Sequence, residues 1–205
     1  FIIFMIILIC SFAELIDPSV ESIYNYKKYM EDTFDSYQSD HYIFYYEKDN
    51  PVKNYIYIWQ RELEDYYDES SKKYSFEINK KIKIFISKSY EELNSITNFY
   101  PHSNSNLNYI FTRTSLSTTK HELAHTFSNY FSQEKINHNI FLSEGFANYN
   151  AYSQDVINKY HQISYYFLKN QIISLDKLFN INNDLVEERK LNYYMGPSYI
   201  DYLIK

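Results

Sequence analysis

The residues best suited to chemistry are the histidines and the glutamate of residues 121–125, which read His-Glu-Leu-Ala-His, an H-E-x-x-H motif. Residues four apart on a helix lie on the same face, with Cβ atoms about 5–6 Å apart. Two imidazoles at this spacing can bind one metal ion, and Glu122 beside them can reach a metal-bound water. The flanks favour a helix, because serines and threonines suited to N-caps precede an apolar face. The motif arises by chance on the order of once in a hundred such sequences, so a third ligand is needed.

That third ligand is Glu144, which follows His125 by nineteen positions within residues 141–149, Phe-Leu-Ser-Glu-Gly-Phe-Ala-Asn-Tyr. The gap allows one helix to end and a second helix to bring the carboxylate back to the metal. Two histidines and a glutamate with an open fourth position form a catalytic zinc site rather than a structural one. Gly145 lacks a Cβ and is expected to let the two ligand helices approach closely. The sequence therefore predicts a Zn²⁺ site made by His121, His125 and Glu144.

On these residues the sequence resembles the gluzincin metallopeptidases, and within them the small secreted or membrane-attached peptidase MA-like domains. In those domains a Trp-Leu-x-Glu-Gly-x-Ala-x-Tyr run follows H-E-x-x-H. The likeness covers residues 42–203 in outline and is specific over 121–149. It implies that His121, His125 and Glu144 bind zinc and that Glu122 is the general base. It also implies a thermolysin-like core, in which a small twisted sheet lies beside a helical lobe with the metal between them.

Two positions depart from the family pattern. Phe141 stands where the family usually has Trp, and Asn148 stands one turn after Glu144, where relatives place an acidic residue that steadies a ligand histidine. Asparagine can accept the same hydrogen bond but adds no negative charge, so we expect weaker metal affinity. The Gly-x-Met-Glu-Asn strand that captures the substrate amino terminus in the aminopeptidases is absent. The choice between endopeptidase and exopeptidase action therefore stays open.

The resemblance also implies an oxyanion donor in residues 193–196, Tyr-Tyr-Met-Gly. In the aminopeptidases a tyrosine three residues before a glycine stabilises the oxyanion, and Tyr193 has this spacing to Gly196. Because the chain holds 25 tyrosines, this spacing can arise by chance, and the neighbouring Tyr194 is the competing candidate for the oxyanion donor. If neither tyrosine donates, His138 or His161 is the next candidate. Apart from the motif, the histidines are expected to be packed in the fold or solvated: His41, His102, His138 and His161.

The expected function is that of a zinc-dependent peptidase acting on a peptide or protein substrate. Zinc activates a water, Glu122 takes its proton and passes it to the leaving amine, and Tyr193 or a neighbour donates to the oxyanion. The alternative is a catalytically weak or inactive peptidase-like binding module, which Asn148 favours and the retained Glu122 argues against. A protein without a metal, in which the motif is accidental, is disfavoured by Glu144 at the right gap.

The elements that must position these residues can be predicted from hydrophobic periodicity. Helical spacing covers residues 21–39, 51–67 and 89–96, and strand patterns cover 41–46, 81–87 and 109–112. Residues 98–108 are expected to form a loop, and the pattern from residue 117 onward is helical almost to the end. Strands and helices mixed in the first half, followed by helices alone, predict an α+β fold with a mostly helical C-terminal lobe.

Composition excludes several other classes of protein. With 205 residues, 45% hydrophobic and 22% charged, the chain is typical of one globular domain. A net charge of -6 argues against a nucleic-acid partner. The single cysteine, Cys10, lies in the N-terminal apolar segment, which leaves no thiolate for catalysis or metal binding. No glycine-rich phosphate loop is present, so we expect no nucleotide cofactor.

The N-terminal segment predicts export. Residues 1–13 are almost all apolar, and the run is too short for the about 20 residues that span a bilayer. It is typical of a truncated signal peptide, with Ser-Phe-Ala as the cleavage site, followed by one peptidase domain over residues 14–205. We therefore expect a secreted or extracytoplasmic protein without stable membrane insertion after signal removal. The alternative is a truncated membrane anchor. The helical pattern still runs at Lys205, which leaves open whether the domain is complete there.

Overall fold

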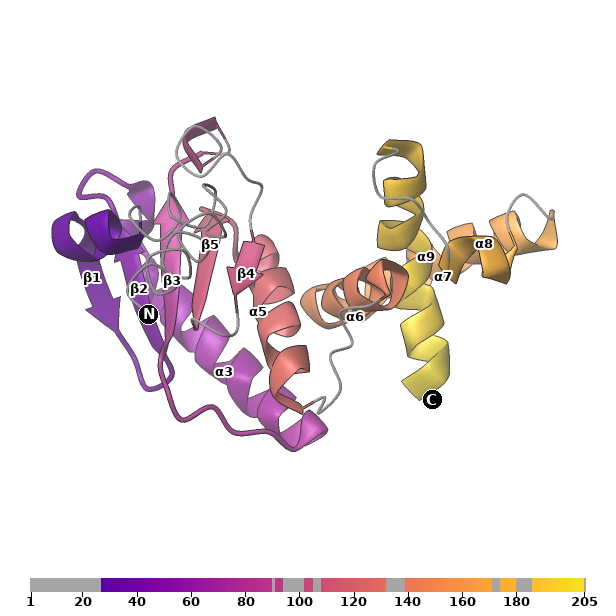
Figure 1. The fold of residues 1–205 in the computed structure, drawn as a ribbon, viewed down its shortest axis with the longest axis horizontal. Helices are drawn as coiled ribbons and strands as arrows, with labels where there is room; N and C mark the ends of the chain where they lie inside the picture. Colours follow the sequence, from indigo (N-terminus) through magenta and orange to yellow (C-terminus); the bar gives the residue numbers. More distant parts are fainter. Residues whose placement is uncertain are drawn as a thin grey trace, which may run out of the picture.

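The computed structural model of the chain describes residues 27–89, 91–93, 102–104, 108–131, 139–170, 174–179 and 186–204. The expected signal peptide over residues 1–13 lies outside them, and so does half of the helix expected over 89–96; its described residues 91–93 are helical. Within these ranges the chain forms a mixed sheet covered by helices, followed by a lobe made of helices alone (Figure 1). The α+β class predicted from the sequence is confirmed.

The sheet joins three parallel central strands to two antiparallel edge strands. Its strands lie in the order β1 (Asp35–Gln38), β2 (Tyr42–Tyr46), β3 (Ile82–Ser87), β5 (Tyr109–Arg113) and β4 (His102–Asn104). Phe44 of β2, Ile84 of β3 and Ile110 of β5 lie side by side in the parallel register. The edge strands β1 and β4 pair antiparallel with their neighbours. β3 is buried on both faces, as expected for a parallel strand with helical structure on either side.

Two helices cover one face of the sheet. α3 (Ile56–Tyr74) connects β2 to β3, and α5 (Leu116–Phe131) follows β5 after two residues. Leu63 of α3 and Leu123 of α5 join the same apolar cluster as the strand residues Ile84 and Ile110. The opposite face holds a smaller cluster around Phe85. α5, the helix that carries H-E-x-x-H, is therefore held against a rigid core.

The start of α3 is anchored to the sheet by one asparagine. Asn50 accepts a hydrogen bond from the Val52 backbone N–H at 3.0 Å and caps the short 3-10 helix η1 (Pro51–Asn54). Its amide nitrogen donates to the Ile86 carbonyl of β3, also at 3.0 Å. Asn50 is 2% exposed, so both bonds are shielded from water. They hold η1, and with it the start of α3, against the central strand β3.

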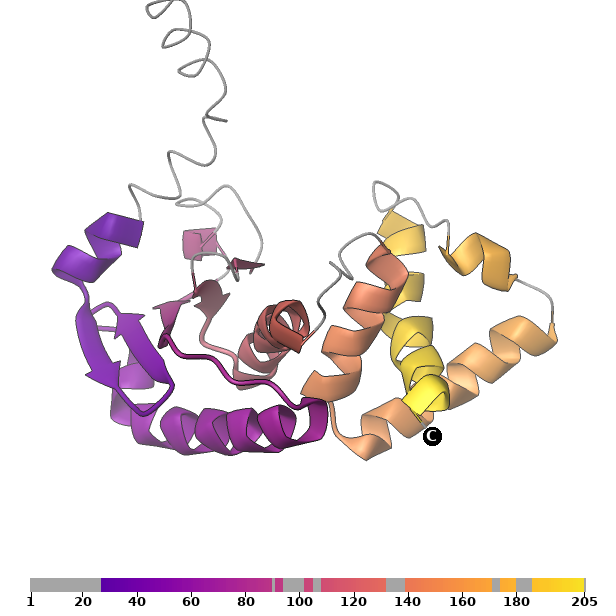
Figure 2. The ribbon, with the colours of Figure 1, turned by 60° about the horizontal axis from the view of Figure 1, so that its bottom comes forward.

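The C-terminal lobe consists of α6 (Ile140–Ala151), α7 (Gln154–Lys169), α8 (Leu175–Phe179) and α9 (Val186–Ile204). Figures 1 and 2 show α6 between α5 on one side and α9 on the other. Phe141 of α6, Leu178 of α8 and Met195 of α9 form the apolar centre of the lobe. α6 therefore joins the helical lobe to the part of the molecule that contains the sheet.

The chain's two glycines face each other where α6 meets α9. A Cβ built on Gly145 would lie 2.7 Å from the carbonyl carbon of Gly196, and one on Gly196 would lie 2.6 Å from the Cα of Gly145. These distances are far below van der Waals contact, so neither position has room for a side chain. The sequence-based expectation for Gly145 was wrong about the partner: the helix that it lets approach is α9 and not the other ligand helix, α5.

Several predicted boundaries were wrong. The helix expected over residues 21–39 ends at residue 33, because residues 35–38 pair with β2 as a strand. The loop expected over 98–108 includes β4, which pairs with β5. α3 runs on to Tyr74, beyond the expected end at residue 67. In the first two cases pairing with the next strand along the chain overrides the local pattern. Among the described helices, none has the length and apolar character needed to cross a membrane.

Candidate metal centre

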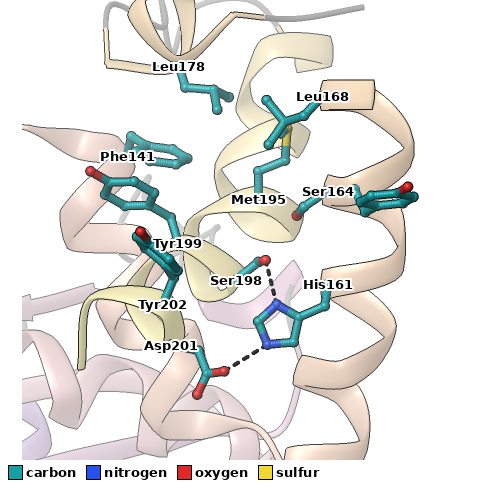
Figure 3. A pocket seen from close by; sticks show the side chains of 11 residues that line it. Phe141, His161, Ser164, Leu168, Leu178, Met195, Ser198, Tyr199, Asp201 and Tyr202 are labelled. Atoms are coloured by element: carbon teal, nitrogen blue, oxygen red, sulfur yellow. Dashed lines mark hydrogen bonds and ion pairs between the residues drawn. The ribbon is translucent and has the colours of Figure 1, made fainter. Parts of the chain in front are cut away.

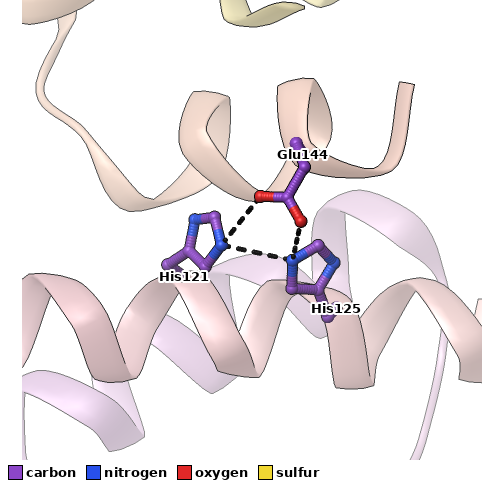
Figure 4. Close-up of side chains that lie close together, drawn as sticks. All are labelled: His121, His125 and Glu144. Carbon is purple, nitrogen blue, oxygen red and sulfur yellow. Dashed lines mark hydrogen bonds and ion pairs between the residues drawn. The ribbon is translucent and has the colours of Figure 1, made fainter. Parts of the chain in front are cut away.

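Three side chains from two helices converge at one point between α5 and α6. His121 and His125 lie one turn apart on α5, and Glu144 reaches them from α6 (Figure 4). The two Nε2 atoms are 3.2 Å apart. Glu144 Oε2 lies 3.3 Å from His121 Nε2, and Glu144 Oε1 lies 3.5 Å from His125 Nε2. The three ligands that the sequence proposed are thus brought together with one ligand atom from each residue within 4.8 Å of the others.

These distances fit a metal ion. Tetrahedral bonds of about 2.0–2.1 Å place neighbouring ligand atoms about 3.3 Å from each other, close to the separations found here. Glu144 Oε2 is buried and, among the described residues, has no hydrogen bond of good geometry. An anionic oxygen facing imidazole nitrogens needs either a proton or a cation between them. His121, His125 and Glu144 therefore form a group that can hold a metal ion.

The outer nitrogen of each imidazole has its own hydrogen-bond partner. His121 Nδ1 lies 2.9 Å from Asn148 Oδ1, and His125 Nδ1 lies 3.1 Å from Ser143 Oγ. Because Asn148 Oδ1 can only accept, His121 carries its proton on Nδ1 and, when neutral, keeps a lone pair on Nε2. Asn148 is completely buried. The structure places it within hydrogen-bond reach of His121, as expected from the sequence, and this bond fixes the orientation of the ring.

Ser143 was not singled out from the sequence. It directly precedes Glu144, so one turn of α6 supplies both a ligand and the residue that orients another ligand. Metal-binding histidines almost always hydrogen-bond through the other ring nitrogen, so a partner for His125 Nδ1 was to be expected, and Ser143 is one polar residue near Glu144 that could supply it. Sequence spacing alone does not indicate which hydroxyl reaches His125, since that depends on how α5 and α6 pack.

The electrostatics of the site favour an ionised Glu144. Burial raises the pKa of this carboxyl, but its close contacts with the imidazoles of His121 and His125 outweigh it, so the pKa lies well below its usual range. Burial lowers the pKa of His121, yet the nearby carboxylate of Glu144 raises it overall. Metal ligands must be deprotonated carboxylates and neutral imidazoles. A cation binding here would therefore displace a proton held between His121 and Glu144.

Glu122, the residue after His121, is more fully shielded from water than the three clustered side chains. It is 6% exposed, and burial raises the pKa of its carboxyl, partly offset by the nearby imidazoles of His121 and His125. A carboxylate with a raised pKa is a stronger base than one in water. Its place and its basicity suit the role of proton acceptor that the sequence proposed.

The structure separates the two candidate tyrosines. The Tyr193 ring lies 6.3 Å from the His121 ring, centre to centre, and the side chain is 36% exposed. Tyr194 instead packs edge-on against Tyr160, with ring centres 5.5 Å apart. Tyr193 is therefore the one whose ring contacts a ligand histidine. Tyr152, which the sequence did not single out, lies near enough to Glu144 and Tyr194 for their negative charges to raise the pKa of its hydroxyl. Burial is the larger cause of the rise.

No family model, curated protein or solved structure matches this chain. Function is therefore inferred from the geometry of the candidate metal centre and from the chemistry of its donors.

The other histidines differ in their surroundings. His41 lies just before β2 rather than in it; its ring stacks on Tyr67 and hydrogen-bonds to Glu64. His161 does more than pack, because it hydrogen-bonds to two side chains of α9. His138 lies outside the described residues, and β4 places His102 in a strand rather than in a loop.

Proposed function

We propose that this protein is a zinc-dependent peptidase of the gluzincin type. The observation that carries the proposal is the convergence of His121 and His125 on one helix with Glu144 on the next. Two imidazoles and one carboxylate are the donors of catalytic zinc sites, which leave a coordination position open. A purely structural site does not need Glu122, the buried carboxylate that stands between the two histidines in the sequence.

Zinc held by these three residues would activate a water and polarise the scissile carbonyl of a peptide. Glu122 accepts a proton from the attacking water and passes it to the leaving amine. The Tyr193 hydroxyl donates a hydrogen bond to the oxygen that becomes negative, a role suited to a phenol that stays neutral at pH 7. Asn148 and Ser143 hold the imidazoles, so that no reorientation is needed during the reaction.

The substrate is a peptide or protein that reaches the site where α5, α6 and α9 come together. Glu122 stands on α5 and Tyr193 on α9, so the proton acceptor and the oxyanion donor belong to separate elements. A peptide bond lying over the three ligands can contact both. The proposal therefore requires the packing of α6 on α5 and on α9 to be intact.

The deciding experiment combines metal analysis with digestion of a broad peptide library. We expect one zinc per chain and peptide hydrolysis by the native protein. Glu122→Gln should keep the zinc and lose hydrolysis, because glutamine cannot accept the proton. Glu144→Gln should lose both. Equal hydrolysis by the native protein and Glu122→Gln would contradict the proposal. Zinc binding without hydrolysis by either would instead indicate the binding-module alternative.

A further inference from the structure

A second site lies within the helical lobe, in a pocket of about 630 Å³ between α6, α7, α8 and α9. Its volume is in the range of small-molecule sites. It shares no residue with the metal centre. Figure 3 shows that apolar side chains line one part of the pocket and polar side chains the other. The apolar lining includes Phe141, Leu168, Leu178 and Met195.

The polar part is built around His161. Asp201 Oδ2 accepts a hydrogen bond from His161 Nε2 at 2.8 Å, and Ser198 Oγ lies 2.7 Å from His161 Nδ1 (Figure 3). Because a carboxylate only accepts, Nε2 carries the proton, and in the neutral ring Nδ1 accepts from the Ser198 hydroxyl. Ser198 then presents the remaining lone pairs of its oxygen as acceptors.

One more hydroxyl in the pocket has no partner. Ser164 stands one turn after His161 on α7, is 5% exposed, and its Oγ makes no hydrogen bond with any described residue. A buried hydroxyl without a partner is unfavourable, because it has lost its hydrogen bonds to water. Its proton and lone pairs are available to a bound molecule. The pocket thus offers one acceptor, Ser198 of α9, and one donor-acceptor, Ser164 of α7.

The charges nearby favour a neutral ligand. Asp201 is 2% exposed, and its Oδ2 accepts the hydrogen bond from His161 Nε2. An anionic ligand would be repelled by this buried carboxylate. A cationic ligand would lose its hydration in a largely apolar pocket, in which the one carboxylate of the lining residues, Asp201, already accepts from His161. A hydroxyl group can donate to Ser198 and accept from Ser164 at the same time.

We propose that this pocket binds a small, uncharged, largely apolar molecule that carries one hydroxyl group. Its apolar body lies against Phe141, Leu178 and Met195, and its hydroxyl lies between Ser164 and Ser198. This site is separate from the proposed peptidase chemistry and needs no metal.

The experiment uses 2-naphthol as the probe, with the chain labelled at its methionine methyl groups. The Met195 methyl lines the pocket, whereas Met30 lies in the cluster on the far face of the sheet and serves as an internal control. We expect the Met195 resonance to shift on titration with 2-naphthol and the Met30 resonance to stay. Binding of 2-methoxynaphthalene, which cannot donate, should be weaker by about three- to tenfold. Binding of the anionic 2-naphthoate should be weaker still.

Ser164→Ala should weaken the binding of 2-naphthol and of 2-methoxynaphthalene alike, by about three- to tenfold, because the oxygen of either probe accepts the hydrogen bond from Ser164. Ser70→Ala is the matched control, because Ser70 is equally buried at 5% exposure but lies on α3. An unmoved Met195 resonance at millimolar 2-naphthol would overturn the proposal. So would equal affinity of Ser164→Ala and the native chain for 2-naphthol.

Discussion

At the scale of single residues, the orientation of each imidazole depends on one hydrogen bond from α6. Asn148 bonds to His121 through a neutral oxygen. Asn148→Asp would put a negative charge on the same atom and make the imidazole a better donor to zinc. We expect zinc affinity to rise by about tenfold, within the range of effects of such partners. A zinc competition titration measures it, with Ser143→Ala expected to lower the affinity. An unchanged affinity in Asn148→Asp would show that this bond does not tune the metal.

The proposed oxyanion donor can be tested against its sequence neighbour. Tyr193→Phe should lower kcat by about 10²–10³ with little change in KM, because the hydrogen bond forms mainly in the transition state. Tyr194→Phe is the matched control and should be close to native, since its ring packs on Tyr160 rather than on a ligand. Steady-state kinetics on one peptide substrate compare the two. A severe loss only in Tyr194→Phe would reverse the assignment.

The pair of Glu64 and His41 should affect stability in acid. Burial raises the pKa of Glu64, but hydrogen bonds from the backbone and ring of His41 outweigh it and lower the pKa overall. A lowered carboxyl pKa contributes stability above its unfolded value, near about 4.3, and this is lost as pH falls through the folded value. As the pH falls below about 4.3, we expect the free energy of unfolding to decrease less in Glu64→Gln than in the native protein. Urea unfolding from pH 6 to pH 3 measures it, and parallel curves would contradict the prediction.

At the scale of elements, the contact between α6 and α9 depends on two glycines. A methyl group at Gly145 would lie 2.7–2.8 Å from backbone atoms of Gly196, which cannot rotate away. Gly145→Ala should therefore destabilise the protein by about 1–3 kcal/mol, the usual cost of overpacking, even though alanine favours a helix by about 1 kcal/mol. Because Glu144 is the adjacent residue, zinc affinity should fall as well.

Thermal unfolding and zinc titration of Gly145→Ala measure both effects. Gly196→Ala provides the reciprocal test, since its Cβ would meet Gly145 Cα at 2.6 Å and the Phe141 carbonyl oxygen at 3.1 Å. An unchanged or higher Tm in both variants would show that the two helices can separate at little cost.

At the scale of the whole molecule, zinc should join the sheet-containing part to the helical lobe, because its ligands come from α5 and α6. Free zinc at 100 times its Kd should raise the free energy of unfolding by about 2.7 kcal/mol. For a chain of this size, that corresponds to about 5–10 °C in Tm. Removal of zinc with EDTA should reverse the shift. His121→Ala is the control and should show no response to zinc; an equal response would place the metal elsewhere.

The sequence by itself determined what depends on neighbours along the chain. A helix brings residues four apart to one face, so the spacing of His121 and His125 was enough to predict a shared ligand point. Strand periodicity likewise predicted residues 81–87 and 109–112 and the α+β class, because alternation and apolar runs reflect burial directly. The gap to Glu144 indicated a second helix, since that length fits a return of the chain.

Only the tertiary structure decided which faces of these elements meet. Periodicity shows that Gly145 and Tyr193 lie on helices, but not that Gly145 contacts Gly196 or that Tyr193 rather than Tyr194 contacts His121. His161 was expected only to pack in the fold. Its hydrogen bonds to Ser198 and Asp201 span 37 and 40 positions in the chain, and the structure places its ring in the lining of a pocket. Local sequence sets the pattern on each helix, whereas the angle and depth at which helices pack depend on side chains from all of them at once.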